Sequence, residues 1–351
     1  MAVINQVITD DYAAYNGDCI EVMKGMRDES VHLVVYSPPF AGLYQYSSDE
    51  RDMSNSIDHD EFFTHYGYAI SETARLLLPG RLAFVHCMDI PLSNGGCDAM
   101  FDLPGRIIRE HEARGFAFAG RRAIWKEPLL VRNRTMMKSL HHATICSDST
   151  RTSVANADYL LTFRKRGDNP IPVEHPTGLL SYAGEDDPTV GLEGYKGMTG
   201  DQKKNLFSQH IWRRYASSVW MDIRVDRVLK HREAREEEDE RHVHPLQLDV
   251  IERAVVMGSN PGEVVLTPFM GVGSEVYGAV INGRRGVGIE LKEAYFNQAV
   301  LNLKDAASGD SSKELETRSM LDLLTEGETE PEDKPETIPT KRGRKKQEAN
   351  Q

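Results

Sequence analysis

The chain has 351 residues, and 42 Lys and Arg against 54 Asp and Glu give it a formal net charge of −12. Its 40% apolar and 27% charged residues are typical of a globular protein, and its length suffices for one large domain with an insertion or for two domains. The negative charge by itself argues against a nucleic-acid partner, because binding to phosphates requires a positive surface.

Signals for membranes, secretion and disulfides are weak in this sequence. The longest charge-free run, 31–48, contains prolines and hydroxyl side chains, so we do not expect it to span a membrane. The first residues lack the basic start and apolar stretch of a signal peptide. The 4 cysteines have no CxxC spacing, which argues against a disulfide framework and a zinc cluster. We expect a cytoplasmic protein with no membrane partner and no metal.

The first part of the chain alternates between helical and strand-like segments. Behind a candidate N-cap at Asp18, apolar residues recur at helical spacing, and the apolar run Val31–Tyr36 predicts a buried parallel strand. The periodicity of 61–78 predicts a helix that ends at Pro79-Gly80, and 81–86 predicts a second strand.

The same alternation returns near the C-terminus. A helix is predicted at 246–257, a strand at Val264–Thr267, a second strand at 286–290 and a helix at 292–303. A glycine-rich bend and a helix that ends at Ile281 separate the two strands. Strands that alternate with helices in this way predict an α/β fold with a mostly parallel sheet.

Two segments interrupt the pattern. Residues 170–243 are rich in proline and glycine and end in a strongly charged helix, which predicts an inserted or appended module. From Asp305 onward the hydrophobicity is low and like charges occur in blocks, so we expect a disordered tail. The expected organisation is a core in two parts with a module between them and a tail: 1–169, 170–243, 244–304 and 305–351.

The first motif that can carry chemistry is Ser37-Pro38-Pro39-Phe40. It follows a predicted strand, and ligands bind at the carboxyl ends of parallel strands. The prolines fix the backbone, so the motif can accept hydrogen bonds from an exocyclic amine and stack the attached base on the ring of Phe40. Taken alone, the tetrapeptide is a weak signal, because Ser-Pro-Pro is more often a loop with an incidental aromatic residue.

The second motif is the glycine-rich turn 268–273, between a predicted strand and a helix. Glycines at such a junction let a ligand approach the backbone. Val276 occupies the position of the third glycine of the dinucleotide fingerprint, which argues against a nicotinamide site. Glu290 ends the next predicted strand, where its carboxylate can accept hydrogen bonds from ribose hydroxyls.

Five motifs occur along the chain in a fixed order: Asn16-Gly17-Asp18-Cys19, Ser37-Pro38-Pro39-Phe40, His244-Pro245-Leu246-Gln247, Pro268-Phe269-Met270-Gly271-Val272-Gly273 and Gly288-Ile289-Glu290. Together they resemble the S-adenosylmethionine-dependent DNA amino-methyltransferases, which methylate N4 of cytosine or N6 of adenine. The catalytic motif precedes the cofactor motif, as in the permuted β group of that family. The resemblance covers 15–303 apart from the middle module. It implies a Rossmann-like methyltransferase fold, double-stranded DNA as partner, and a target-recognition region at 170–243.

The resemblance also implies roles for individual residues. Ser37 and the Pro38 carbonyl would accept hydrogen bonds from the target amine, Pro39 would hold the elbow, and Phe40 would stack on the flipped base. The residues implied to bind S-adenosylmethionine are Asp18, Cys19, Pro245, Gln247, Thr267, Phe269, Gly271, Gly273 and Glu290. Thr267 departs from the family, which usually has an acidic residue there, and Glu275 is a candidate to replace the missing charge.

A local excess of positive charge answers the objection raised by the net charge. Residues 120–169 hold ten Lys and Arg against four Asp and Glu, whereas 236–240 are all acidic. DNA binding requires a basic face on the protein and does not require a positive net charge, so we expect a positive cleft beside Phe40. The expected DNA-binding residues in this stretch and in the middle module are Arg121, Arg122, Lys126, Arg132, Arg134, Arg213 and Arg214.

Several alternatives remain open at this stage. Serine at position 37 favours cytosine N4 slightly over adenine N6 as the target. A catalytically silent DNA-binding protein and an amino-methyltransferase acting on protein or RNA are the competing interpretations. His86, His141 and His142 show no metal-binding spacing and are interpreted as structural. A bacterial or phage origin, a homodimer and an accompanying restriction enzyme are all compatible with the resemblance.

Overall fold

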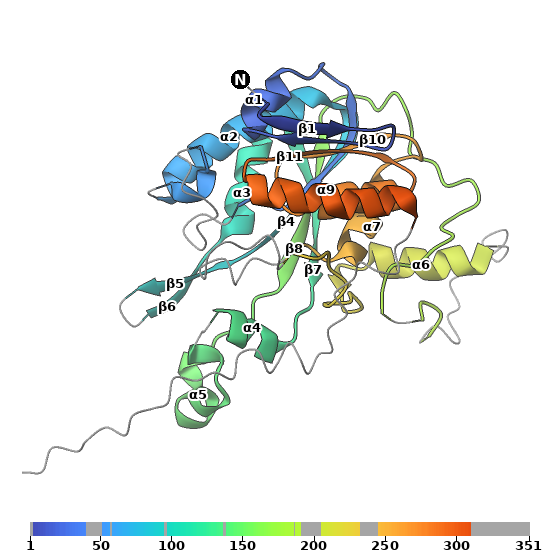
Figure 1. Cartoon of the computed structure of the whole chain (residues 1–351). Coiled ribbons are helices and arrows are strands. Elements are labelled where there is room, and N and C mark those ends of the chain that lie inside the picture. Colours follow the sequence, from blue (N-terminus) through green and yellow to red (C-terminus); the bar gives the residue numbers. More distant parts are fainter. Residues whose placement is uncertain are drawn as a thin grey trace, which may run out of the picture.

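The computed structural model describes residues 3–39, 51–56, 58–94, 97–135, 138–185, 187–190, 205–231 and 245–309 (Figure 1). Phe40, His244, the acidic run 236–240, part of the middle module and the chain beyond Gly309 lie outside the described residues. Within the described ranges, no helix is long and apolar enough to cross a membrane.

Nine strands of the described residues form one sheet at the centre of the molecule. Their order is β1 (Asn5–Ile8), β2 (Tyr12–Asn16), β11 (Arg285–Glu290), β10 (Val264–Thr267), β3 (Val31–Tyr36), β4 (Leu77–Met88), β8 (Asp158–Lys165), β7 (Phe116–Ile124) and β9 (Val219–Trp220). The strands from β2 to β4 are parallel, whereas β1 is antiparallel at one edge and β8 is antiparallel to both of its neighbours. The expected α/β fold with a mostly parallel sheet is confirmed.

The strands expected from apolar runs are present in the structure. Val31–Tyr36 and Val264–Thr267 form β3 and β10, and the strands expected at 81–86 and 286–290 lie within β4 and β11. The two strands at the centre of the sheet, β3 and β10, are buried along almost their whole length, which explains why their sequences are apolar without alternation.

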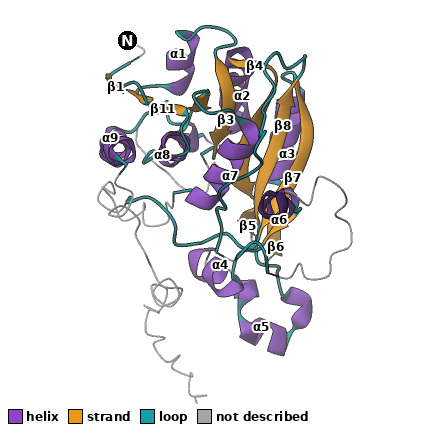
Figure 2. Ribbon diagram, turned by 90° about the vertical axis from the view of Figure 1, so that its right-hand side faces the viewer, coloured by secondary structure: helices purple, strands orange, loops and turns teal. Residues whose placement is uncertain are grey.

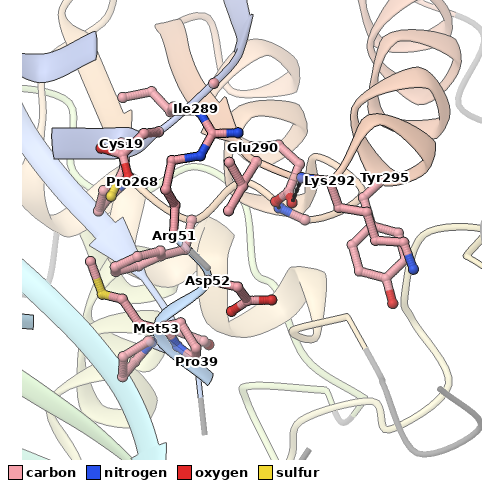
Figure 3. Close-up of a pocket in the computed structure, with 17 residues that line it drawn as sticks. Cys19, Pro39, Arg51, Asp52, Met53, Pro268, Ile289, Glu290, Lys292 and Tyr295 are labelled. Carbon is pink, nitrogen blue, oxygen red and sulfur yellow. Dashed lines mark hydrogen bonds between the residues drawn. The ribbon is translucent and has the colours of Figure 1, made fainter. Parts of the chain in front are cut away.

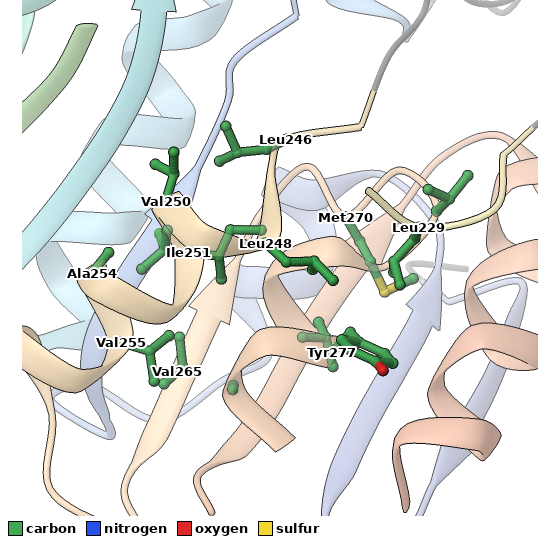
Figure 4. Packing of buried hydrophobic residues seen from close by; sticks show 14 of the residues in the cluster. Leu229, Leu246, Leu248, Val250, Ile251, Ala254, Val255, Val265, Met270 and Tyr277 are labelled. Atoms are coloured by element: carbon green, nitrogen blue, oxygen red, sulfur yellow. The ribbon is translucent and has the colours of Figure 1, made fainter. Parts of the chain in front are cut away.

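Two apolar clusters lie on opposite faces of the sheet, because successive side chains of a strand point to opposite sides. In β3, Leu33 and Val35 belong to one cluster, whereas Val34 and Tyr36 belong to the other. The first face is covered by α7 (Leu248–Gly258), α8 (Ser274–Ile281) and α9 (Glu293–Ser308) (Figure 4). The second face is covered by α1 (Cys19–Lys24), α2 (His59–Leu76) and α3 (Leu103–Glu112) (Figure 2).

The helix α2 is shifted toward the N-terminus relative to the expected 61–78. It begins at His59, because the Asp58 carboxylate accepts a backbone hydrogen bond from the first turn and caps the helix there. It ends at Leu76, and 77–80 join β4 instead. A residue before proline is disfavoured in helical conformation, so Leu78 ahead of Pro79 cannot continue the helix without strain.

The helix α9 is longer than expected. It continues past Leu303 to Ser308, and Gly309 ends it in the left-handed conformation with a φ of 70°. Ala306 is buried in the first apolar cluster, so packing against the core stabilises this additional turn. Residues 305–308, expected to belong to a disordered tail, are therefore helical.

Smaller elements connect these layers. The short η1 (Met53–Asn55) precedes α2, and the hairpin of β5 (Ile90–Asn94) and β6 (Cys97–Phe101) separates β4 from α3. Between β7 and β8 the chain forms α4 (Pro128–Thr135), η2 (Lys138–Leu140), α5 (His142–Ser147) and η3 (Ser149–Arg151). The α4–α5 segment projects away from the sheet (Figure 1).

The described part of 170–243 is joined closely to the core. It contains α6 (Leu206–Ala216) and β9, and β9 pairs with β7 as the last strand of the central sheet. Trp220, Ile223 and Leu229 from this segment are buried in the first apolar cluster. The described part of the expected module thus extends the sheet and the core.

Candidate active site

Several loops meet at one edge of the sheet. The strands β2, β3, β10 and β11 are parallel, so their carboxyl ends lie at that edge. Asp18 follows β2, Ser37 follows β3, Pro268 follows β10 and Glu290 ends β11. These residues line a cavity of about 190 Å³ (Figure 3).

Most of the residues expected at the site line this cavity. Those that do are Asp18, Cys19, Ser37, Pro38, Pro39, Phe269, Gly271 and Glu290. The catalytic and the cofactor motifs come from opposite ends of the chain, and the parallel pairing of β3 with β10 brings them together. Phe40 lies outside the described residues.

Two backbone hydrogen bonds hold the carboxylate of Glu290, which lines the cavity. Its Oε2 accepts a hydrogen bond of 2.8 Å from the Gly271 backbone N–H, and its Oε1 accepts one of 2.8 Å from the Lys292 backbone N–H. Burial raises the pKa of Glu290 to about 7, against the opposing effect of these two hydrogen bonds. A carboxylate has about four acceptor sites, so Glu290 can still accept hydrogen bonds from a ligand in the cavity.

The two glycines of the turn after β10 have different roles. Gly271 has a φ of +53° and lines the cavity, and a Cβ atom at this position would meet no atom within 4 Å. Gly273, with a φ of +97°, is the N-cap of α8 and does not line the cavity. A Cβ at Gly273 would lie 3.2 Å from the Cβ of Ala299, so this glycine allows α9 to approach the turn closely.

Three further residues expected to bind the cofactor are not part of the cavity wall. Pro245 is half-buried, and Thr267 and Gln247 are buried, but none of them lines the cavity. The hydroxyl of Thr267 and Oε1 of Gln247 have no hydrogen-bond partner among the described residues. Their cofactor contact therefore remains a prediction.

The charge missing at Thr267 is not replaced by Glu275. Burial raises the pKa of Glu275 to about 8, so its carboxyl group is mostly protonated at neutral pH. Asp52, by contrast, lines the cavity, and its charge contributes to the raised pKa of Glu290. The structure therefore offers Asp52 as the additional carboxylate of the cavity.

Sequence reasoning missed part of the cavity wall. Arg51, Asp52 and Met53 precede α2 and carry no motif that could have identified them (Figure 3). Lys292 and Tyr295 also line the cavity, and the Lys292 ammonium lies 4.9 Å from the centroid of the Tyr295 ring. Their position directly after Glu290 is the signal that could have identified these two.

His86 lies beside Ser37, although the sequence led us to interpret it as structural. The Ser37 Oγ and the His86 Nδ1 are 3.0 Å apart, and His86 Nε2 lies 2.8 Å from Oδ2 of Asp158. Lys126 completes the arrangement, with its Nζ 2.5 Å from the same Asp158 oxygen. Detecting this cluster requires the strand order, because β3, β4 and β8 become neighbours only in the sheet.

The basic residues expected to contact DNA have different surroundings on β7. Arg121 is exposed, with its guanidinium over the rings of Phe118 and Tyr159 at 5.7 and 5.8 Å. Arg122 is half-buried and donates hydrogen bonds of 3.1 Å to the Tyr215 carbonyl and 3.1 Å to the Thr162 hydroxyl. Burial also lowers the pKa of Arg122, so its contacts are those of a core residue.

The remaining basic residues lie on helices outside the sheet. Arg132 is half-buried on α4, where it donates to Asn133, and the side chain of Arg134 lies outside the described residues. Arg213 and Arg214 lie in the last turn of α6. DNA contact by these side chains stays a prediction. For Lys126 the structure assigns an intramolecular partner, Asp158.

Metal-binding and thiol chemistry find little support in the described part of the chain. It contains no group of three His, Cys, Asp or Glu side chains placed to hold a metal ion. Cys19 and Cys87 are buried, and burial raises the pKa of both thiols. These two cysteines are therefore poor nucleophiles.

Comparisons with known sequences point to one family. The model of a family of N6 and N4 methyltransferases, described as DNA methylase, matches residues 31–301. The chain is 25% identical to the type II methyltransferase M.BamHI of Bacillus amyloliquefaciens over 85% of its own length, but it spans only 58% of that protein. It is 23% identical to the DNA adenine methyltransferase YhdJ of Escherichia coli K12, over 86% of this chain and 85% of YhdJ.

Solved structures support the same fold. A candidate DNA modification methylase from Thermus thermophilus, TTHA0409, superposes with a TM-score of 0.55 at 22% identity, over 86% of this chain and 96% of that one. Its complex with S-adenosyl-L-methionine gives a TM-score of 0.53. The PvuII DNA methyltransferase, which is cytosine-N4-specific, gives 0.51 at 15% identity, over 83% of this chain and 86% of that one.

Proposed function

Because this chain belongs to the DNA methylase family of N6 and N4 methyltransferases, we propose that it transfers a methyl group from S-adenosylmethionine to an exocyclic amine of a base in double-stranded DNA. One observation carries the proposal: Ser37-Pro38-Pro39 and the cofactor motif around Gly271 and Glu290 line the same cavity. This cavity lies at the carboxyl edge of the sheet, where doubly wound folds bind their ligands.

The residues that line the cavity suit S-adenosylmethionine in their chemistry. Gly271 leaves open space at the wall, Phe269 and Ile289 offer apolar surface, and Glu290 has acceptor capacity for ribose hydroxyls. Asp52 provides a carboxylate in a cavity that would receive a cationic ligand. Bound S-adenosylmethionine supplies a methyl group on a sulfonium, which an amine nitrogen can attack.

In the proposed reaction, Ser37 and the Pro38 carbonyl accept hydrogen bonds from the target amine. The lone pair of an aromatic amine is delocalised into its ring, so acceptors that favour the tetrahedral nitrogen stabilise the transition state more than the ground state. The base must leave the duplex to reach the cavity, at a cost of a few kcal/mol, and we propose that Phe40 stacks on it.

For duplex binding we propose a set of basic residues on β7, α4 and α6. The exposed side chain of Arg121 and those of Arg132, Arg213 and Arg214 are the proposed contacts to phosphates and bases. Cytosine N4 is slightly favoured over adenine N6 as the target because position 37 is a serine. Relatives of both kinds occur, since YhdJ is an adenine methyltransferase and the PvuII enzyme is cytosine-N4-specific.

A catalytically silent DNA-binding protein is the second candidate. It is favoured by Thr267, which lacks the usual acidic side chain, and by Glu275, whose burial raises its pKa to about 8 and leaves it mostly uncharged at neutral pH. Under this alternative, the fold and the basic residues would retain DNA while the cavity no longer supported transfer.

The full chain, isotopically labelled S-adenosylmethionine and mixed-sequence duplex DNA distinguish these candidates. We expect label in the DNA, and nucleoside mass spectrometry then identifies N4-methylcytosine or N6-methyladenine. DNA binding without transferred label would support the silent protein. Label in added protein or RNA, and none in DNA, would contradict the proposed substrate.

A further inference from the structure

Four side chains form a hydrogen-bonded chain that ends at the cavity. We call Lys126, Asp158, His86 and Ser37 the Ser37 relay. Consecutive members are joined by distances of 2.5, 2.8 and 3.0 Å. Ser37 follows β3, His86 is near the end of β4, Asp158 begins β8 and Lys126 follows β7, so the relay crosses four strands at the carboxyl edge.

Asp158 is the fixed negative charge of the relay. It is 1% exposed, and burial alone would raise its pKa, but the charge of Lys126 and the hydrogen bonds from Lys126 and His86 outweigh burial and hold the pKa of Asp158 well below its usual range. Asp158 is therefore ionised at neutral pH and can only accept hydrogen bonds.

An ionised Asp158 determines the tautomer of His86. Its Oδ2 must accept the hydrogen bond from His86 Nε2, so Nε2 carries the hydrogen of the neutral imidazole. In the neutral form of His86 the other nitrogen, Nδ1, is then unprotonated and can only accept. The Ser37 hydroxyl must donate its hydrogen to Nδ1 across their 3.0 Å separation.

This direction of hydrogen bonding leaves the Ser37 oxygen as an acceptor toward the cavity. A serine hydroxyl has one hydrogen and two lone pairs, and the single hydrogen is committed to His86. Ser37 lines the cavity, so its lone pairs are available to a donor there. An exocyclic amine is such a donor, whereas a ring nitrogen with a lone pair is not.

We propose that His86, oriented by Asp158 and Lys126, is a positioning residue that keeps Ser37 in its accepting state and takes up the proton released in methyl transfer. The inference rests on the proposed function. As the amine nitrogen forms its bond to the methyl carbon and the sulfur–methyl bond breaks, the nitrogen becomes positively charged. Its proton passes to Ser37 Oγ, the Ser37 proton passes to His86 Nδ1, and the resulting imidazolium is paired with Asp158.

The surroundings of His86 agree with this assignment. From β8 it faces Asp158, from the end of β7 it is reached by Lys126 through Asp158, and from β3 it faces Ser37. The neighbouring Cys87 belongs to the apolar cluster on the opposite face of the sheet. The charge of Lys126 balances Asp158 while His86 is neutral, and Asp158 remains ionised to pair with His86 when it is protonated.

Two variants of the full chain test the relay. In Asp158→Asn the side-chain amide can donate to His86 Nε2, which moves the imidazole hydrogen to Nδ1 and reverses the bond to Ser37. In His86→Gln an acceptor oxygen remains for Ser37, but no group can take up a proton. We expect both variants to slow single-turnover methyl transfer about 100-fold or more, with affinities for S-adenosylmethionine and duplex DNA unchanged. Asp28→Asn, at the opposite edge of the sheet, is the matched control and should transfer at the wild-type rate.

The tautomer of His86 separates the relay from a merely structural effect. Nitrogen-15 shifts of histidine-labelled protein report this tautomer, with the His86 signal identified by its loss in His86→Gln. We expect a hydrogen on Nε2 in the wild type and on Nδ1 in Asp158→Asn.

The outcomes distinguish the relay from the proposed function. Active wild type together with unimpaired Asp158→Asn and His86→Gln would overturn the relay and leave the methyltransferase proposal intact. A hydrogen on Nδ1 in the wild type would also overturn the relay, whether or not transfer occurs. Absence of transfer by the wild type would contradict the proposed function, while the nitrogen shifts would still decide the tautomer on which the relay depends.

Discussion

At the scale of single residues, the proposed chemistry of the cavity depends on the hydroxyl of Ser37 and on the absence of a side chain at Gly271. Ser37 is a hydrogen-bonding group that lines the cavity from the catalytic motif, and Gly271 lines it from the cofactor motif. Ser37 interacts with His86, whereas the Gly271 backbone N–H holds Glu290. Substitutions at the two positions should therefore affect different properties, the rate of methyl transfer at Ser37 and cofactor binding at Gly271.

We expect Ser37→Ala to slow methyl transfer about 100-fold or more with unchanged cofactor affinity, because it removes an acceptor that acts on the developing charge. Gly271→Val should abolish cofactor binding, because a β-branched side chain at a φ of +53° is strained and would project into the cavity. Calorimetric titration with S-adenosylmethionine and single-turnover transfer measure the two effects.

A matched glycine controls for backbone strain. Gly283 also has a positive φ, of 72°, and a Cβ there would meet no atom within 4 Å, but it does not line the cavity. Gly283→Val should therefore cost stability without a loss of cofactor binding. Equal losses of cofactor affinity in Ser37→Ala and Gly271→Val would contradict the assigned roles.

At the scale of elements, one buried ion pair links the two parts of the core. Arg81 lies on β4 and forms a salt bridge with Glu263, which directly precedes β10. The Arg81 guanidinium also donates to the carbonyls of His32, 3.0 Å, and Gly258, 3.3 Å. Arg81 thus connects the start of β4 with β3, with the end of α7 and with the approach to β10.

We expect Arg81→Ala to lower the free energy of unfolding by about 3–5 kcal/mol, because it leaves the buried carboxylate of Glu263 without its cationic partner. Urea unfolding followed by circular dichroism measures the change. The control is Lys24→Ala, which breaks an exposed pair with Glu21 and should leave the free energy of unfolding nearly unchanged. A similar cost in both variants would show that the buried pair does not clamp the two parts.

At the scale of the whole molecule, the charge is divided unevenly. The chain carries a net charge of −12, yet the segment 120–169 is basic, and its α4–α5 part projects from the carboxyl edge that bears the cavity. Not all of these bases face solvent, since Arg122 bonds within the core and Lys126 pairs with Asp158. The exposed side chain of Arg121 and that of Arg132 remain the proposed contacts in this segment.

Duplex binding should therefore be steeply dependent on salt. Each phosphate contact contributes a slope of about −0.9 in a plot of log affinity against log salt, so Arg121→Ala and Arg132→Ala should each reduce the magnitude of the slope by about 1. Fluorescence anisotropy of a labelled mixed-sequence duplex measures it. Lys304→Ala, an exposed residue of α9 outside this segment, should leave the slope unchanged. If duplex binding by the wild type did not depend on salt, the negative net charge would again argue against DNA as the partner.

The sequence by itself determined the fold class and the main site motifs. The apolar runs of β3 and β10 are local features of the sequence. Consecutive apolar residues in each run predict a strand that is buried on both faces. The parallel α/β pattern then implied that Ser37 and Glu290 follow strands at the same edge, and both line the cavity. Helix ends were less predictable, because a cap at Asp58 and packing of Ala306 moved the ends of α2 and α9.

Only the tertiary structure decided which side chains surround these motifs. The order of strands in the sheet places His86 and Asp158 beside Ser37, and the segment that precedes α2 brings Asp52 into the cavity. It also brings the half-buried Arg122 into hydrogen-bonding contact with the Tyr215 carbonyl. Contacts between residues far apart in the chain depend on strand order and on which face each side chain occupies, and a local pattern of residues specifies neither of these.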